Sequence, residues 1–148
     1  MDRIYVFGFN EMPLLGDGWY DPERLEGGPA FRATAPRARL VLREWGVDEV
    51  ILICSARPTF TGEPLRAALV DPWQRTTPVV ISSDAWHMRR YVPPCRGEVV
   101  GHLDIVVENP WSPRQVFGSA DRRVLGLLVW AVRLSIRSGD HERSSGLA

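Results

Sequence analysis

The stretch Val132-Arg133-Leu134-Ser135-Ile136-Arg137 alternates apolar and polar side chains. Successive side chains of a β-strand point to opposite faces, so this pattern predicts a strand with one face on a core and the other in water. A helix over 121–137 is the alternative, because the segment contains good helix formers and Asp121 could cap it. Gly126 interrupts that helix, and the alternation after it favours a strand. The segment 36–44 has a similar ambiguity, and alternation favours a strand there too.

Short extended runs of this kind recur along the chain. Leu103, Ile105 and Val107 alternate with Asp104 and Val106, which predicts another half-buried strand. Turns rich in Gly and Pro separate the runs at a spacing typical of a sandwich. The sequence therefore predicts an all-β fold, a two-sheet antiparallel β-sandwich of about eight to nine strands. We expect these strands near 4–9, 29–34, 38–44, 49–55, 65–70, 77–82, 86–91, 98–108 and 124–136.

The composition indicates one globular domain. The chain has 148 residues, 45% of them hydrophobic and 24% charged, which is enough to bury a core. We predict a β-sandwich domain over 1–137 and a disordered tail over 138–148, because the tail has almost no apolar residues. The N-terminus lacks the apolar segment of a secretory signal. The longest apolar stretch, 124–132, is far shorter than the roughly 20 residues of a membrane helix, so we expect a cytoplasmic protein without a membrane span.

The charged residues argue against a nucleic-acid partner and against lysine chemistry. The 18 basic residues match the 18 acidic ones, giving a formal net charge of zero, whereas a nucleic-acid surface needs a basic excess. All 18 basic residues are arginine. Lysine-based Schiff-base or phosphate-loop chemistry is therefore excluded.

Motifs for catalysis and metal binding are absent from the sequence. It contains no GxSxG, no HExxH and no glycine-rich phosphate loop. The carboxylates between Asp17 and Glu26 could in principle hold calcium, but their spacing is not that of an EF-hand and favours a solvated loop. His87 and His102 would share a metal only if their strands paired in the right register. We predict no catalytic residue, no cofactor and no metal site.

The aromatic residues carry the strongest hint of a ligand. Trp19, Tyr20 and Trp111 lie in segments rich in Gly, Pro and polar residues, whereas Trp130 belongs to an apolar strand and is predicted to be core. Aromatic side chains on loops offer large flat surfaces that can stack on sugar rings. The alternative is that they close the open ends of the sandwich.

Several segments follow one another in a distinctive order. They are Gly18-Trp19-Tyr20-Asp21-Pro22-Glu23, Pro29-Ala30-Phe31-Arg32-Ala33-Thr34-Ala35-Pro36-Arg37-Ala38, Glu108-Asn109-Pro110-Trp111-Ser112-Pro113 and Ser119-Ala120-Asp121-Arg122-Arg123-Val124-Leu125-Gly126. Through them, over about 14–136, the chain resembles the β-sandwich accessory modules fused to, or encoded beside, bacterial glycosyltransferases and methyltransferases of surface-polysaccharide pathways. The resemblance implies a carbohydrate-binding-like, jelly-roll fold. The family pattern has a tryptophan after Phe-Arg, where this chain has Ala33.

The resemblance implies a non-catalytic, carbohydrate-binding-like module that supports a glycan-modifying enzyme, with a glycosyltransferase or methyltransferase as partner. The aromatic side chains of the site would stack on a sugar, and its arginines would bind hydroxyl or acidic groups. The predicted ligand-binding residues are Trp19, Tyr20, Arg32, Trp111 and Arg122. Alternatively, Arg32, Asp121 and Arg122 form a charged network that locks the ends of the domain together.

A second function remains open at this point. The same aromatic surface, or an edge strand of the sandwich, could dock a protein partner or a second copy of the chain. The alternative prediction is therefore a protein-interaction or assembly module, including a homodimer.

Overall fold

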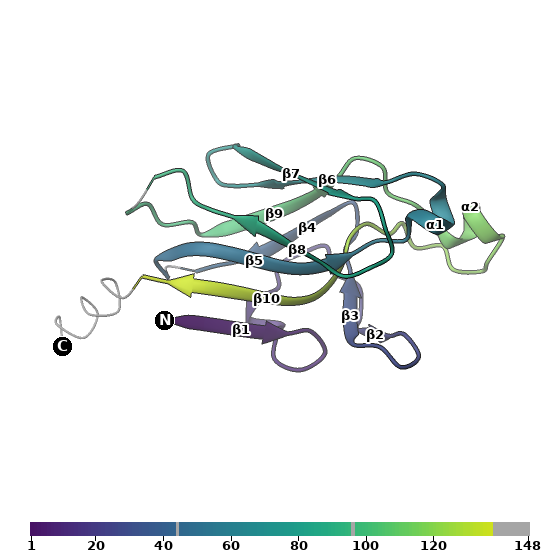
Figure 1. The fold of residues 1–148 in the computed structure, drawn as a ribbon, viewed down its shortest axis with the longest axis horizontal. Coiled ribbons are helices and arrows are strands. Elements are labelled where there is room, and N and C mark those ends of the chain that lie inside the picture. The colour runs from purple at the N-terminus through teal and green to yellow at the C-terminus, as the bar shows by residue number, and fades with distance from the viewer. Residues whose placement is uncertain (44, 96, 138–148) are drawn as a thin grey trace.

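Two antiparallel β-sheets pack face to face in the molecule (Figure 1). The structure is a computed structural model and describes residues 1–43, 45–95 and 97–137. The predicted all-β, two-sheet sandwich is confirmed. The predicted tail, 138–148, lies outside the described residues, and the domain boundary at 137 stays a prediction.

Each sheet is built from strands far apart in the sequence. Sheet A contains β1 (Asp2–Val6), β2 (Glu23–Arg24), β3 (Ala30–Ala33), β5 (Val47–Ser55), β8 (His87–Tyr91) and β10 (Leu128–Ile136). Sheet B contains β4 (Arg37–Val41), β6 (Leu65–Val70), β7 (Thr76–Ile81) and β9 (His102–Val107). The helical turns are η1 (Met12–Leu14), α1 (Pro58–Thr61) and α2 (Pro113–Phe117). All the strands except the two-residue β2 overlap predicted ranges.

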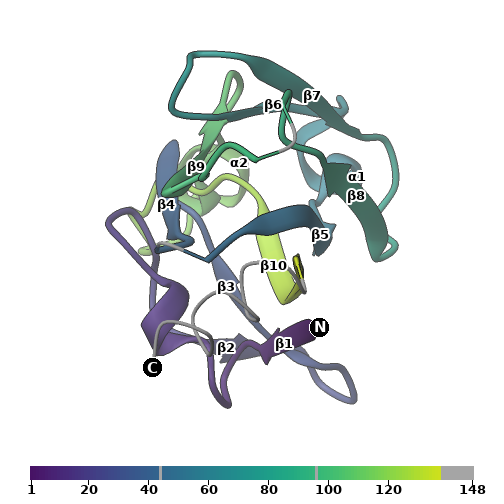
Figure 2. The ribbon, with the colours of Figure 1, turned by 90° about the vertical axis from the view of Figure 1, so that its left-hand side faces the viewer.

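The strand order is that of a jelly roll. Sheet A runs β3-β10-β5-β8 and sheet B runs β4-β9-β6-β7, so the chain crosses between the sheets at almost every step. Strands β2 and β1 extend sheet A beside β3 and β10. Figure 2 shows β6 and β7 at one side of the molecule and β1 and β2 at the other. This order confirms the predicted jelly-roll-like architecture.

The main core lies between the sheets, where the alternating strands meet. Leu103 and Ile105 of β9 face Val132 and Leu134 of β10 across it, and all of them are fully buried. Burying each such side chain contributes about 1.5–3 kcal/mol to folding. The period-two pattern therefore identified the inner faces of both strands correctly.

Gly126 explains why the C-terminal segment enters a strand and not a helix. A Cβ at this position would lie 2.5 Å from the Thr34 hydroxyl oxygen and 2.7 Å from a Val107 methyl. The Gly126 amide donates to the Thr34 carbonyl at 2.8 Å, and the Leu127 amide donates to the Thr34 hydroxyl at 3.0 Å. These contacts hold extended backbone against the end of β3, and β10 follows directly.

Trp130 does not lie in the main core, contrary to prediction. The pairing of β10 with β5 shifts between Val129 and Ala131, so Trp130 is the extra residue of a bulge. Its ring is only partly buried and contacts Trp86. The run around Trp130 is apolar throughout, and its sequence therefore cannot tell inward from outward positions.

Sheet B carries an ion-pair cluster on its outer face, beside a cavity of about 290 Å³. The Asp104 carboxylate is almost fully buried, with 3% of its side chain exposed, and accepts hydrogen bonds from Arg37 at 2.7 Å and from Arg39 at 2.8 and 3.1 Å. Hydrogen bonds from Arg39, aided by Arg37, hold the pKa of Asp104 below its ordinary value although burial opposes this. The charged form of Asp104 therefore stabilises the fold.

We expect the Asp104 cluster to make stability depend on acid pH. Because the pKa of Asp104 is lowered on folding, its contribution is present above the unfolded-state pKa of about 3.9 and is lost as pH falls below it. Asp104→Asn should lower the free energy of unfolding at neutral pH by about 1–3 kcal/mol and flatten this acid limb. Urea unfolding of both proteins between pH 2 and 7 measures this. If the free energies of unfolding of the two proteins changed with pH in parallel, the assignment of the acid limb to Asp104 would be contradicted.

Candidate functional site

Three aromatic side chains gather at the end of the sandwich where α1 and α2 lie side by side (Figure 1). Phe60 of α1 is 45% exposed and Phe117 of α2 is 57% exposed, and their ring centroids are 5.0 Å apart. Trp111 lies within 6.0 Å of Phe60 and 6.4 Å of Phe117. We call these residues the loop triad. Edge-to-face packing stabilises such a group while leaving ring faces in water.

A second aromatic group lies on the outer face of sheet A. Trp86, just before β8, packs 6.1 Å from Phe31 of β3 and 5.9 Å from Trp130 of β10. Phe31 is buried, whereas the two tryptophans are partly exposed. We call these residues the sheet group. The sheet group therefore extends across sheet A, from the segment before the edge strand β8 to β10 and β3.

A small apolar cluster lies beneath both groups. It is separate from the main core and consists of Phe31, Ala33, Leu125 and Leu128. Trp86, Trp111 and Tyr20 pack against it from outside. Both groups and Tyr20 therefore pack against one buried cluster, and together we call them the aromatic strip.

Ala33 lies underneath the aromatic strip. Only 1% of its surface is exposed, and its neighbours are the other residues of the small cluster. In this chain, then, position 33 is a packing position and not one that faces solvent. A small side chain therefore lies under Trp86 and Trp111.

Tyr20 is held at the border of the strip by an ion-pair network. Its hydroxyl donates to the Val124 carbonyl at 3.1 Å, and the Arg123 guanidinium lies 5.4 Å from its ring centroid. Arg123 pairs with Asp121 at 2.7 Å and with Glu23 at 2.8 Å. The hydrogen bonds to Arg123 lower the pKa of Asp121. This network ties the segment before β10 to β2.

Two of the predicted ligand-binding residues point away from the strip. Trp19 packs edge-to-face on Phe7 at 5.4 Å against the main core, and its Nε1 donates to the Arg39 carbonyl at 2.9 Å. Arg32 pairs with buried Glu11 at 2.9 Å and donates to the Tyr20 carbonyl at 3.1 Å. Both side chains are engaged with the protein itself.

The remaining predicted residues lie on or near the strip. Trp111 belongs to the loop triad, Tyr20 lies at the border, and Arg122 is exposed beside the network. The predicted network of Arg32, Asp121 and Arg122 does not form. Asp121 instead pairs with Arg123, one residue further along, whose amide and guanidinium both donate to its carboxylate, and Arg32 pairs with Glu11.

Sequence reasoning missed Phe60 and Phe117, the most exposed rings of the strip. A signal was present, since each lies in a short segment that begins with proline and ends in glycine. Proline at the first turn and glycine past the last turn mark a helix, and Gly62 and Gly118 both adopt positive φ there. A one-turn helix buries little, so an aromatic side chain on it is left at the surface.

Arg57 supplies a positive charge close to the strip. It lies just before α1, and its Nη1 donates to the Ser55 hydroxyl at 3.2 Å, the Ala56 carbonyl at 2.8 Å and the Asp84 carbonyl at 3.4 Å. Ser55 is paired in register with Leu128 of the small cluster. The guanidinium therefore lies between the loop that leads to Trp86 and the helix that carries Phe60.

Among the described residues, no group of three or more His, Cys, Asp or Glu side chains could hold a metal ion. The carboxylates between Asp17 and Glu26 are used otherwise or point to solvent; Glu23, for example, pairs with Arg123. His87 lies in sheet A and His102 in sheet B. Nor is any helix of the described part long and apolar enough to cross a membrane.

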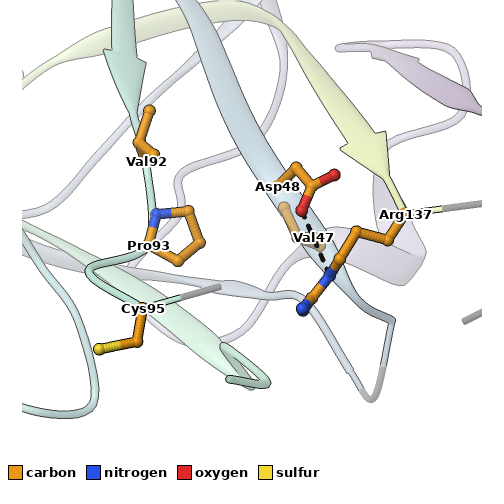
Figure 3. Close-up of a pocket in the computed structure, with 6 residues that line it drawn as sticks. All are labelled: Val47, Asp48, Val92, Pro93, Cys95 and Arg137. Atoms are coloured by element: carbon orange, nitrogen blue, oxygen red, sulfur yellow. Dashed lines mark ion pairs between the residues drawn. The ribbon is translucent and has the colours of Figure 1, made fainter. Parts of the chain in front are cut away.

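A separate pocket of about 250 Å³ lies between the start of β5, the segment after β8 and the end of β10 (Figure 3). An ion pair of 3.2 Å joins Arg137 to Asp48 in its wall, and the Cys95 thiol points away from that pair. The rest of the lining is small and apolar, from Val47, Val92 and Pro93. This pocket offers no aromatic platform, so we place the candidate site on the aromatic strip.

Comparison with known proteins shows a likeness to solved structures and none in sequence. No protein-family model matches the chain, and no curated protein matches it in sequence. A solved structure described as the low-affinity xylan binding module CBM86, from the gut symbiont Roseburia intestinalis, aligns over 94% of this chain and 98% of its own. The identity is 12% and the TM-score 0.44. At this distance the likeness leaves the ligand to be inferred from this chain's own residues.

Proposed function

We propose that the protein is a non-catalytic carbohydrate-binding module that stacks sugar rings on the aromatic strip. The observation that carries the proposal is that two groups of exposed or partly exposed rings pack against one small buried cluster: Phe60 and Phe117 with Trp111, and Trp130 with Trp86. Aromatic rings with exposed faces present rigid apolar area at low entropic cost, which suits the apolar faces of sugars.

Polar groups at the border of the strip support a sugar ligand over a purely apolar one. Arg57 lies between its two halves, and the Arg123 network flanks Tyr20. Binding sites for small polar molecules combine aromatic lining with a few fixed polar groups that set orientation. Sugar hydroxyls both donate and accept, so arginine and carboxylate groups can each bind them.

The proposal assigns no reaction to the protein. The carboxylates that the described residues place beside the strip are already engaged: Asp121 and Glu23 with Arg123, and Asp84 with Thr59. Such groups are poorly suited to act as the acid and base of glycoside hydrolysis. A supporting role beside a glycosyltransferase or methyltransferase in the cytoplasm is part of the proposal. Co-purification with the product of a neighbouring enzyme gene tests that role.

Tryptophan fluorescence tests the proposed ligand class, because three of the six tryptophans lie on the strip. Titration with a panel of neutral and acidic bacterial polysaccharides should give a saturable change for at least one of them. Bovine serum albumin serves as the protein control for bulk viscosity effects. A flat response across the whole panel would overturn the proposal.

A second candidate function, self-association, is favoured by a different surface. Ile4, Phe9 and Met12 are 58%, 83% and 65% exposed near the edge strand β1, which pairs only with β10 among the described strands. The Asn10 side chain binds the Ile4 carbonyl and the Val6 amide at this edge, so contact with another chain would use the exposed apolar side chains. Light scattering at several concentrations tests this, and a monomer throughout would remove the homodimer.

A further inference from the structure

Arg57 is a partly buried arginine whose hydrogen bonds to the described residues all go to uncharged oxygen atoms. Its hydrogen-bond partners are a hydroxyl and two carbonyl oxygens, all of them bound through Nη1. It forms no ion pair with a carboxylate of the described residues. By contrast, Arg32 and Arg123 pair with Glu11 and Asp121.

The Asp84 carboxylate is engaged with another residue and not with Arg57. That carboxylate accepts hydrogen bonds from the amide and the hydroxyl of Thr59, whereas only the main-chain carbonyl of Asp84 contacts Arg57. Burial lowers the pKa of Arg57, although the negative charge of Asp84 opposes this shift. A partly desolvated cation with neutral neighbours gains most from an anion that comes from outside.

The position of this charge links it to the candidate site. Ser55, which accepts from Arg57, also donates to the carbonyls of Asp84 and Ala85, directly before Trp86. Phe60 follows Arg57 by three positions on α1. A ligand stacked on the strip would therefore pass beside the guanidinium, whose Nε and Nη2 make no hydrogen bond to the described residues.

We propose that the ligand of the aromatic strip is an acidic glycan and that Arg57 binds its oxyanion group. The inference rests on the proposed function, because it names the ligand class of the same site. The shared chemistry is an oxyanion on a sugar: a uronate carboxylate, a sulfate ester or a phosphate diester. A planar guanidinium can donate two parallel hydrogen bonds to any of these.

The first test compares ligands on the wild-type protein. The probes are polygalacturonate and its carboxyl-reduced form, with a sulfated glucan and a phosphodiester-linked teichoic acid as the other acidic arms. We expect at least one acidic polymer to bind about tenfold or more tightly than its neutral counterpart, with the difference shrinking in 0.5 M salt. The acidic polymer that binds identifies whether the ligand carries a carboxylate, a sulfate ester or a phosphodiester.

The second test changes Arg57 itself. Arg57→Gln should remove the preference for the acidic polymer, and Arg57→Lys should restore part of it, because the charge returns without the bidentate geometry. Arg75→Gln is the matched control, since it removes the same charge at an exposed position in the turn between β6 and β7. It should bind like the wild type. Thermal unfolding of each variant confirms that it is folded before binding is compared.

The outcomes separate the two proposals. The wild type could bind acidic and carboxyl-reduced polymers equally, with the same affinities in Arg57→Gln. That result would overturn the acidic-ligand inference but would not contradict the glycan-binding function. Loss of preference in Arg75→Gln as well would show a general charge effect and would also overturn it. Absence of binding to every polymer, neutral or acidic, would instead overturn the function.

Discussion

Gly18→Ala should lower the free energy of unfolding by about 2–5 kcal/mol, a large share of the stability of a domain of this size. Gly18 adopts a φ of +93°. An added Cβ would lie 2.0 Å from the Arg37 carbonyl oxygen and 2.7 Å from the Ala38 Cα, and both atoms belong to the backbone of β4. Left-handed backbone costs a residue with a side chain about 1–2 kcal/mol, and overpacking adds about 1–3 kcal/mol.

The effect is large because of where Gly18 lies. The segment around it crosses from sheet B to sheet A: the Arg39 amide donates to the Asp17 carbonyl at 2.9 Å, and the Ala35 amide donates to the Gly18 carbonyl at 2.7 Å. Displacing this backbone would loosen one end of both sheets. Tyr20, two residues on, would then lose its place at the border of the strip.

Gly27→Ala is the matched control. Gly27 also has a positive φ, +70°, but no atom lies within 4 Å of the position its Cβ would take. The substitution should therefore cost only the backbone preference, about 1–2 kcal/mol. Urea unfolding followed by circular dichroism compares the variants. Equal losses for the two would contradict the close packing of residue 18 on β4.

Removing the two exposed rings of the loop triad should abolish most of the glycan binding. In the double variant Phe60→Ala/Phe117→Ala the strip loses its most exposed aromatic surface, because the two rings are 45% and 57% exposed. Truncating central aromatic contacts commonly costs about 2 kcal/mol or more, which is roughly a thirtyfold loss of affinity. Isothermal titration with the best polymer from the panel measures it.

Phe9→Ala controls for the loss of an exposed phenylalanine as such. Phe9 is 83% exposed in the turn after β1 and is not part of the strip. Its removal should leave the affinity unchanged. The double variant should also unfold at nearly the wild-type temperature, since exposed rings contribute little to the core. Unchanged affinity in the double variant would contradict the placement of the ligand on the loop triad.

Local alternation predicted the sheets well because each strand buries one face. Leu103 and Leu134 lie in the main core as the period-two pattern predicts. The prediction that Trp130 is a core residue was wrong, because a bulge in β10 determines where its side chain points. That bulge depends on the pairing of β10 with β5. A bulge depends on the partner strand, so its position cannot be recognised within a run of apolar residues.

The candidate site was predictable only in part, because the strip is assembled from segments far apart in the chain. Trp111 and Tyr20 were identified by their loop context, and that context also pointed to Trp19, whose ring faces the main core. Phe60 and Phe117 meet only because α1 and α2 fold to the same end of the sandwich. The sequence did not single out Arg57, because whether an arginine pairs with a carboxylate depends on the fold.

The most direct test of the central claim follows the six indole groups one by one in a ¹H–¹⁵N correlation spectrum during titration with the best-binding polysaccharide. Assignment by single Trp→Phe variants identifies each signal. Binding on the strip predicts saturable shifts for Trp86, Trp111 and Trp130. The indoles of Trp19 and Trp45, which pack against the main core, and of Trp73 in the β6–β7 turn should stay in place. Shifts confined to these last three would contradict the account.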